Sequence, residues 1–377
     1  MKILNTKLAF RAAFACAVFL LIVTLPGYAA EIDNDLTKCA DIKDDHAARL
    51  KCFDDLAARN VSVKEIIPAS TAETPGHREA ITEKKNISVM AKHWDMDTDP
   101  NKEKNIFILW PYRPNYFLLA AYNSSPNEDV MLDIDSKAKA QYNEVKFQLS
   151  FKIKAWEDVF RGSLKNIIEN NTGIKGIDIW VAYTQQSFWQ LYNSAFSAPF
   201  RDTNYEPELL FNIRTQYEIP GLMGTKLQFI NVGYNHQSNG RSRPLSRSWN
   251  RLVTNVGLEK DNFGMLIKTW YRIPENEKND DNPDLTRYMG YGELWGTLYW
   301  KKQRLAMMLR NNFRQENLGA VQLDWSIPLS VIHNVLGNKF SFYIQYFNGY
   351  GESLLDYNKS VNRISAGFML ADWNWDI

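Results

Sequence analysis

This sequence lacks several features, and their absence excludes whole classes of protein. After its first 30 residues, the longest apolar run is Tyr116 to Tyr122, whereas a membrane helix needs about 18 or more apolar residues in a row. A bundle of membrane helices is therefore excluded. The 377 residues contain three cysteines, too few for a disulfide scaffold, and their formal net charge of +1 provides no basic patch for nucleic acid. We expect no nucleic-acid partner.

Aromatic side chains, by contrast, are plentiful. The chain has 12 Trp, 18 Tyr and 20 Phe, and 45% of its residues are hydrophobic. A disordered chain is poor in aromatics, so this chain is expected to fold around substantial apolar surface. With a mean hydropathy of −0.39, it looks at first sight like one or two soluble domains.

The N-terminus has the three parts of a secretory signal peptide. Basic residues precede an apolar stretch over 12–25, and small residues follow it up to Ala30. The apolar stretch is too short to span a bilayer. We predict that residues 1–30 are removed on export, with cleavage after either Ala29 or Ala30.

We make two predictions for the segment between the signal peptide and residue 105. Cys39 and Cys52 remain after cleavage, and in an exported chain so close a pair predicts one disulfide within a short helical segment, residues 31–60. The alternative is two free thiols, which a thiol assay on the mature protein would detect. Residues 61–104 are rich in charged residues, Thr and Pro without a sustained period, which predicts a linker or periplasmic segment.

From residue 105 the sequence alternates between apolar and polar residues. Val145, Phe147 and Leu149, for example, alternate with Lys146 and Gln148. A period of two is typical of strands and not of helices. We predict twelve strands, near residues 113–123, 143–155, 177–190, 207–218, 225–238, 248–258, 263–274, 288–301, 303–314, 318–328, 338–348 and 361–372.

The predicted fold is all-β, a twelve-stranded antiparallel transmembrane β-barrel over residues 105–377 with a small N-terminal periplasmic segment. Export, an even number of strands and about 23 residues per strand and turn all suit an outer-membrane barrel. Trp residues recur near the predicted strand ends, where membrane barrels carry aromatic girdles; they are Trp156, Trp189, Trp249, Trp295, Trp300 and Trp373. The alternative is a soluble β-sandwich, which shows the same alternation.

Polar residues on the predicted lipid face are costly and therefore point to function. His236 and Ser238 continue the apolar face of their strand, and Asn250 stands on the apolar face of the next one. Ser238 is a poor nucleophile until a base takes its proton, which a histidine can do near neutral pH. The amide oxygen of Asn250 would hold the other ring nitrogen, as an aspartate does in the usual triad. The alternative is a histidine at a loop end without a special role.

Gln185 is the third polar exception on the lipid face. It lies on the apolar face of the strand predicted near 177–190. A polar side chain that faces lipid usually finds a polar partner, often across an oligomer interface. The alternative is that Gln185 lies near the headgroups and is simply solvated.

Several blocks of the sequence resemble the outer-membrane phospholipase A family of Gram-negative bacteria. The most specific are YNHQSNGRS at 234–242 and SRSWNRL at 246–252, and further matches are FRDTNYEP at 200–207, DDNPD at 280–284, YMGY at 288–291 and GYGESLLDYN at 349–358. The resemblance covers the chain from about residue 105 onward. It implies a twelve-stranded outer-membrane barrel, active as a calcium-dependent homodimer, that hydrolyses acyl esters of phospholipids and lysophospholipids.

The same resemblance implies roles for individual residues. The catalytic set would be the nucleophile Ser238, the base His236, the orienting Asn250 and the oxyanion-binding N–H of Gly240. The calcium ligands would be the main-chain carbonyl of Arg241, the hydroxyl of Ser246 and Ser197 of the partner subunit, with Gln185 at the dimer interface. Few of these ligands are charged, so calcium affinity should be modest and should rise when the dimer completes the set. Arg243 departs from the family, whose members often carry an acidic residue there, and it is expected to weaken or shift calcium binding.

Two other functions stand as alternatives. A barrel with a degenerate site would be a pore or a structural protein, and a pore would conduct ions without hydrolysing lipids. Charged residues predicted to face the lumen could line a channel or pair to fill it; they include Lys146, Lys152, Arg214 and Glu218. A soluble secreted esterase would be recovered without detergent.

Overall fold

The structure is a computed structural model that describes residues 51–52, 88–96, 106–130, 139–160, 163–332 and 339–370. The chain divides into two units, Met1–Thr82 and Glu83–Ile377. In the first unit, residues 51–52 are helical and Cys52 is disulfide-bonded. The predicted signal peptide and Cys39 lie outside the described residues, so the cleavage site and the pairing of Cys39 with Cys52 stay predictions.

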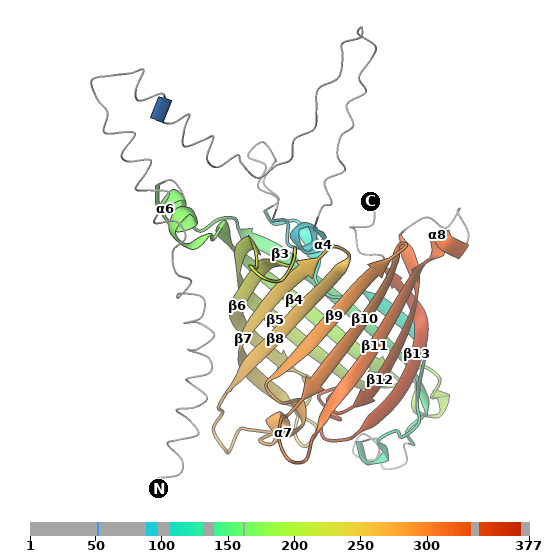
Figure 1. Ribbon diagram of the computed structural model, residues 1–377. Coiled ribbons are helices and arrows are strands. Elements are labelled where there is room, and N and C mark those ends of the chain that lie inside the picture. Colours follow the sequence, from blue (N-terminus) through green and yellow to red (C-terminus); the bar gives the residue numbers. More distant parts are fainter. Residues whose placement is uncertain are drawn as a thin grey trace. The chain divides into compact units, whose positions relative to one another are not determined.

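The second unit is a closed antiparallel barrel of twelve strands, as predicted (Figure 1). Each strand pairs with its neighbours in the chain, and β13 pairs with β2 to close the ring. A short additional strand, β1 (Leu109–Pro111), lies along β3. The strands of the ring are β2 (Tyr116–Asn123), β3 (Asn143–Trp156), β4 (Gly176–Trp189), β5 (Phe200–Glu218), β6 (Lys226–Ser238), β7 (Ser248–Lys260), β8 (Phe263–Ile273), β9 (Gly292–Trp300), β10 (Gln303–Asn311), β11 (Gly319–Pro328), β12 (Phe340–Gly349) and β13 (Val361–Leu370).

The distribution of side chains across the barrel wall is the reverse of that in a soluble protein. On β3, Lys146 and Lys152 are buried in the interior, whereas Leu149 is 51% exposed on the outside. An apolar exterior of this kind faces lipid, and the polar interior needs internal partners. The alternative of a soluble sandwich is therefore wrong. Trp156 and Trp300 are exposed at strand ends as predicted, but Trp249 is fully buried inside the barrel.

Two strands, β5 and β9, begin four or more residues from the predicted position. β5 starts at Phe200, seven residues early, because its first residues pair with the end of β4. β9 starts only at Gly292, because residues Leu285–Met289 form the short helix α7. Other helices of the described residues include α6 (Ser163–Thr172), the 3-10 turn η1 (Ser194–Phe196) and α8 (Leu329–Ile332). None of the helices in the described ranges is long and apolar enough to span a bilayer.

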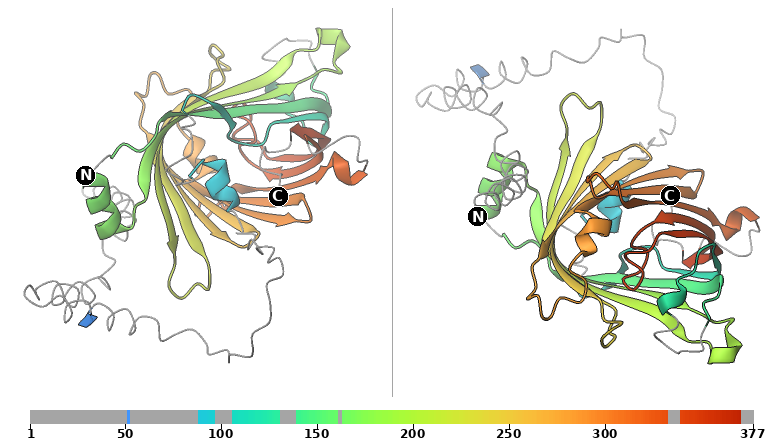
Figure 2. Two further views of the ribbon diagram at one scale, coloured as in Figure 1. Left: turned by 90° about the horizontal axis from the view of Figure 1, so that it is seen from above. Right: turned by 90° about the horizontal axis from the view of Figure 1, so that it is seen from below.

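Residues 88–96 are not part of a linker, which corrects the predicted boundary at residue 104. They form α4 (Val89–His93) and a buried turn, and the helix lies within the ring of strands when the barrel is viewed along its axis (Figure 2). The carboxylate of Glu259 on β7 accepts hydrogen bonds from the Ser88 hydroxyl and from the Val89 N–H, the latter at 2.8 Å. Trp94, just after the helix, is 4% exposed.

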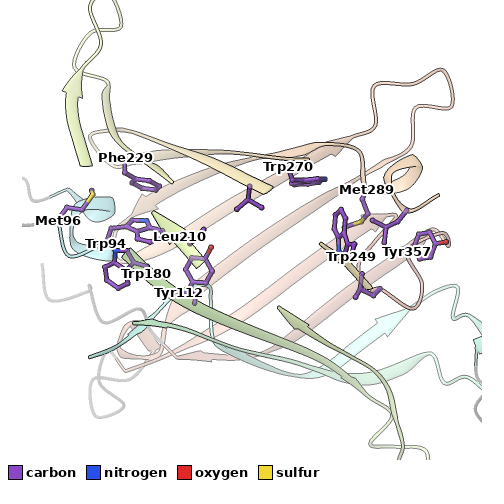
Figure 3. Close-up of a cluster of buried hydrophobic side chains, with 14 residues drawn as sticks. Trp94, Met96, Tyr112, Trp180, Leu210, Phe229, Trp249, Trp270, Met289 and Tyr357 are labelled. Carbon is purple, nitrogen blue, oxygen red and sulfur yellow. The ribbon is translucent and has the colours of Figure 1, made fainter. Parts of the chain in front are cut away.

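Buried apolar side chains lie in the interior near both ends of the barrel (Figure 3). Near α4, the ring of Trp94 meets Trp180 at 5.6 Å and Phe229 at 5.2 Å between centroids. A second group, near α7, contains Trp249, Trp270, Met289 and Tyr357.

Many of the charged side chains that face the interior form ion pairs with one another. These pairs include Lys146–Glu352, Arg363–Glu144, Arg201–Glu144, Arg251–Glu206 and Lys154–Asp95.

Of the four charges predicted to face the lumen, three do so. Lys146, Lys152 and Arg214 are buried inside the barrel. Glu218 is exposed at the end of β5, because a bulge between Arg214 and Tyr217 interrupts the alternation. Charges that are buried and paired fill a lumen rather than line a channel.

Candidate active site

The hairpin of β6 and β7 brings three predicted site residues together. Its register places Asn250 directly opposite His236 and Ser248 opposite Ser238, as the alternation predicted. Asn235, between Tyr234 and His236, is buried in the interior. Because side chains alternate across a strand, His236 and Ser238 project from the outer, lipid-facing side of the wall.

A chain of hydrogen bonds runs outward from the histidine. The Nδ1 atom of His236 lies 2.8 Å from Oδ1 of Asn250, and the hydroxyl of Tyr234 donates to the same oxygen at 2.6 Å. The Nδ2 atom of Asn250 donates to Oε1 of Glu275 at 3.1 Å. An oxygen acceptor at Nδ1 keeps a proton on that nitrogen and leaves Nε2 free to accept one.

The Ser238 hydroxyl makes no hydrogen bond with any described residue. It lies two residues from His236 on the same face, which corresponds to about 6 to 7 Å along a strand. Catalytic hydrogen bonds are often loose in a free enzyme and shorten when substrate binds. The arrangement therefore provides a base with a fixed tautomer beside a serine.

The inner side of the same hairpin is held by buried polar contacts. Arg251 donates to the Asn235 side chain through Nε at 2.9 Å and to Glu206 at 2.8 Å. Trp249 donates through its indole N–H to Gln237 at 2.7 Å. Asn235 and Gln237 flank His236 in β6, so these contacts fix the backbone on both sides of the histidine.

The loop between β6 and β7, residues 239–247, is closed by the side chain of Asn239. Its amide oxygen accepts from the N–H of Arg247 at 3.0 Å, and its amide nitrogen donates to the carbonyl of Leu245 at 2.8 Å. Gly240, the next residue, has a φ of +64°, and a Cβ there would lie 3.1 Å from the ring of Tyr205. Glycine is the residue that adopts this conformation without steric cost.

Oxygen donors of the same loop could hold a cation. The described residues contain no group of three His, Cys, Asp or Glu side chains arranged for a metal ion, so a cation here would depend on carbonyl and hydroxyl oxygens such as those of Arg241 and Ser246. A hydrogen bond from the Ser246 side chain and the nearby guanidinium of Arg243 lower the pKa of Asp281. A hydroxyl that donates its proton to a carboxylate presents its lone pairs outward, as a hard cation such as calcium requires.

Arg243 binds the same carboxylate as the Ser246 hydroxyl. Its Nε donates to Asp281 at 2.5 Å and its Nη2 donates to the carbonyl of Lys278 at 2.8 Å. The side chain of Arg241 is likewise bound to the carbonyl of Phe200 at 2.7 Å. The two arginines therefore connect the loop to its neighbours.

The remaining predicted residues lie on other elements. Ser197 is exposed in the connection between β4 and β5, at φ +56°. Gln185 on β4 accepts from the hydroxyl of Tyr183 at 3.2 Å and donates to Ser187 at 3.3 Å. In a single chain, Gln185 therefore has polar neighbours of its own on the outer face.

Three residues at the candidate site were not predicted from the sequence. Tyr234 could have been found, because it lies two residues before His236 on the same face. Asn239 and Glu275 lie in connections, where no periodic pattern indicates which way a side chain points.

The barrel region of this chain is similar to known proteins. The family model described as Phospholipase A1 matches residues 90–370. The curated "Phospholipase A1" of Klebsiella pneumoniae is 38% identical over 268 residues, which cover 71% of this chain and 84% of that protein. The protein of the same name from Escherichia coli K12 is also 38% identical over 268 residues, covering 71% of this chain and 83% of its own.

Solved structures agree with these sequence matches. Outer membrane phospholipase A from Escherichia coli superposes with a TM-score of 0.61 at 36% identity, covering 71% of this chain and all of that one. An active-site mutant of the Escherichia coli protein, with an asparagine replaced by alanine, gives 0.61 at 35% identity, covering 72% of this chain and 95% of that one. The Salmonella typhi outer membrane phospholipase, solved as a dimer with bound calcium, gives 0.62 at 36% identity with the same coverage.

Proposed function

Because this chain belongs to the phospholipase A1 family of the outer membrane, we propose that it hydrolyses acyl esters of phospholipids and lysophospholipids with Ser238, His236 and Asn250. The observation that carries the proposal is the hydrogen bond of 2.8 Å between His236 Nδ1 and Asn250 Oδ1 on the lipid-facing side of β6 and β7. An active-site asparagine in the similar Escherichia coli structure also supports it. A triad on this face meets the ester bonds of lipids without removing them from the membrane.

The side chains of this chain can divide ester hydrolysis into two steps. First, Ser238 Oγ bonds to the acyl carbon as His236 Nε2 takes the hydroxyl proton, and the glycerol oxygen then leaves with that proton. Second, a water oxygen attacks the acyl–serine ester as His236 takes a water proton, and the fatty acid leaves as Ser238 regains its hydrogen. Asn250 holds the Nδ1 proton throughout, so that Nε2 faces the reaction.

The oxyanion of each tetrahedral intermediate needs donors beside Ser238. The backbone N–H of Gly240 is two residues away in the loop that Asn239 closes. A fixed N–H that points at developing negative charge lowers the barrier without reorganising during the reaction. We therefore include Gly240 in the catalytic set.

Replacement of Gly240 by alanine is expected to lower kcat by about 10²- to 10³-fold, the usual cost of a lost oxyanion donor. The added Cβ would lie 3.1 Å from the Tyr205 ring at a φ of +64°, so the loop must shift. Fatty-acid release from phospholipid micelles measures the effect. Gly221→Ala is the matched control, because Gly221 has a φ of +82° with no atom within 4 Å of the added Cβ. Equal losses in both variants would contradict the role of Gly240.

Calcium is the cofactor that the oxygen donors of the loop suit. The Salmonella typhi relative binds calcium as a dimer, which supports the same requirement here. The Arg241 carbonyl and the Ser246 hydroxyl would hold the ion in one chain, and Ser197 of the partner subunit would complete the set. When bound, calcium would supply positive charge near the oxyanion. Gln185, on the outer face of β4, would lie at the interface of the homodimer.

The alternative of an ion-conducting pore is disfavoured by the filled interior. In planar bilayers, the purified protein is expected to show no stable conductance, because α4, Trp94 and buried ion pairs occupy the lumen. A cavity of about 380 Å³ lies between these groups, lined by polar and charged side chains as well as aromatic ones. Ser238→Ala should behave like the unmodified protein in this assay. Steady single-channel currents together with an absence of hydrolysis would favour the pore.

A further inference from the structure

We propose that Glu275 is a positioning residue that orients the Asn250 amide for His236, and this inference rests on the proposed function. Glu275 follows β8, the third strand at the site. Its Oε1 accepts from Nδ2 of Asn250 at 3.1 Å, while Oδ1 of Asn250 faces His236. Four side chains then act in series: Glu275, Asn250, His236 and Ser238.

The need for such a residue follows from the chemistry of an amide. An aspartate presents oxygen to histidine whichever way its carboxylate turns, whereas an asparagine turned by 180° presents an N–H₂ group instead. That orientation would place a donor against His236 Nδ1 and favour the wrong tautomer. A carboxylate only accepts hydrogen bonds, so Glu275 selects the orientation in which Nδ2 faces outward and Oδ1 faces the histidine.

The sheet register explains how Glu275 reaches this position. Ile273, the last residue of β8, pairs with Asn250, and Glu275 lies two residues further along in the connection, where its carboxylate reaches the Asn250 amide. Tyr234 adds a second donor to Oδ1 at 2.6 Å. A tyrosine hydroxyl can also accept, so Tyr234 alone does not fix the amide.

Glu275 also places a negative charge behind a neutral triad member. Asparagine stabilises the imidazolium less than aspartate does. The Glu275 carboxylate is separated from the imidazole ring by two hydrogen bonds. At that distance its negative charge still stabilises the imidazolium by a Coulomb interaction. Of the arginines in the loop between β6 and β7, Arg243 is held by Asp281 and Arg241 by the Phe200 carbonyl.

A mutant cycle on purified, calcium-loaded protein tests the proposal. Glu275→Ala is expected to lower kcat about ten- to a hundredfold with little change in KM, because a second partner of a catalytic residue orients it without touching substrate. Glu275→Gln retains an acceptor and should recover most of the loss. In the Asn250→Ala background, Glu275→Ala should cost nothing further, because its effect passes through the amide. Glu277→Ala is the control, since Glu277 is exposed in the same connection.

Asn250→Asp supplies a readout that a merely structural role would not move. Two carboxylates in contact disfavour each other's charge, so Glu275 should impair the Asn250→Asp variant. Glu275→Gln, which lowers kcat slightly in the unmodified background, is then expected to raise kcat in the Asn250→Asp background. This reversal of sign would support a direct contact between the two side chains.

Two outcomes would overturn the inference: a cycle in which the losses at 250 and 275 simply multiply, or Glu275→Ala with the kcat of Glu277→Ala. Failure of the proposed function looks different. In that case Ser238→Ala and Asn250→Ala would both retain full hydrolysis. These two variants alone would reveal that failure, without any substitution of Glu275. Heat-modifiable migration in gels confirms for each variant that the barrel has folded.

Discussion

Replacement of Ser238 by alanine is expected to lower kcat for phospholipid hydrolysis by at least about a thousandfold. Without the hydroxyl no acyl–enzyme can form, and removal of one triad member leaves only the acceleration provided by substrate binding and oxyanion stabilisation. Fatty-acid release from mixed micelles of phospholipid and detergent measures the loss. The effect should appear in kcat and not in KM, because the hydroxyl contributes little to lipid binding.

Ser242→Ala is the matched control for this variant. Ser242 lies four residues further on, exposed in the connection between β6 and β7, and it has no role in the proposed chemistry. Its loss should leave kcat within about twofold of the unmodified protein, as is usual for surface substitutions. A Ser238→Ala protein that folds, binds lipid and retains more than a tenth of the activity would refute the nucleophile assignment.

Removal of calcium is expected to reduce hydrolysis more than about a hundredfold. The proposed ligands, a carbonyl and two hydroxyls, are all neutral oxygens, so affinity should be low and a chelator should strip the ion readily. Added calcium should restore activity, whereas magnesium should not, because it demands six close ligands and gives up its water reluctantly. Chemical crosslinking in the same samples should show that the dimer fraction rises with calcium.

Variants of the ligands separate a calcium effect from a general effect of chelation. Ser246→Ala and Ser197→Ala are each expected to raise the calcium concentration for half-maximal activity, with a smaller change in activity at saturation. Ser242→Ala should leave that concentration unchanged. Full activity in chelator, or unaltered calcium dependence in both ligand variants, would contradict the proposed site.

The strands could be predicted from the sequence because the two faces of each strand lie in different environments. Lipid on one side and a polar lumen on the other impose an alternation that β3 maintains from Asn143 to Trp156, within one residue of its predicted end. The predicted strand bounds are wrong where a helix interrupts the alternation. Helix α7 was assigned in part to a strand, because its apolar Leu285 and Met289 are buried against the same interior. Helix α4 spans five residues, too few to show a period.

The site could be predicted in part for the same reason. His236, Ser238 and Asn250 were visible because polar residues on a lipid-facing side break the alternation. The contact between Asn250 and Glu275 was not, because a connection has no period and its path depends on the packing of the neighbouring strands. The proposed contribution of Ser197 depends on a second chain, and one sequence does not show which residues of two chains lie close together.

The position of α4 inside the barrel affects the order in which parts of the barrel are expected to fold. Ser88 binds Glu259, which lies 171 residues later in the chain, and Trp94 packs on Trp180 and Phe229 of β4 and β6. Contacts between residues so far apart in the chain form late, because the intervening chain must first be ordered. We therefore expect the helix to dock after β4, β6 and β7 have paired. Residues 88–96, which precede every strand in the chain, would then be among the last to reach their native positions.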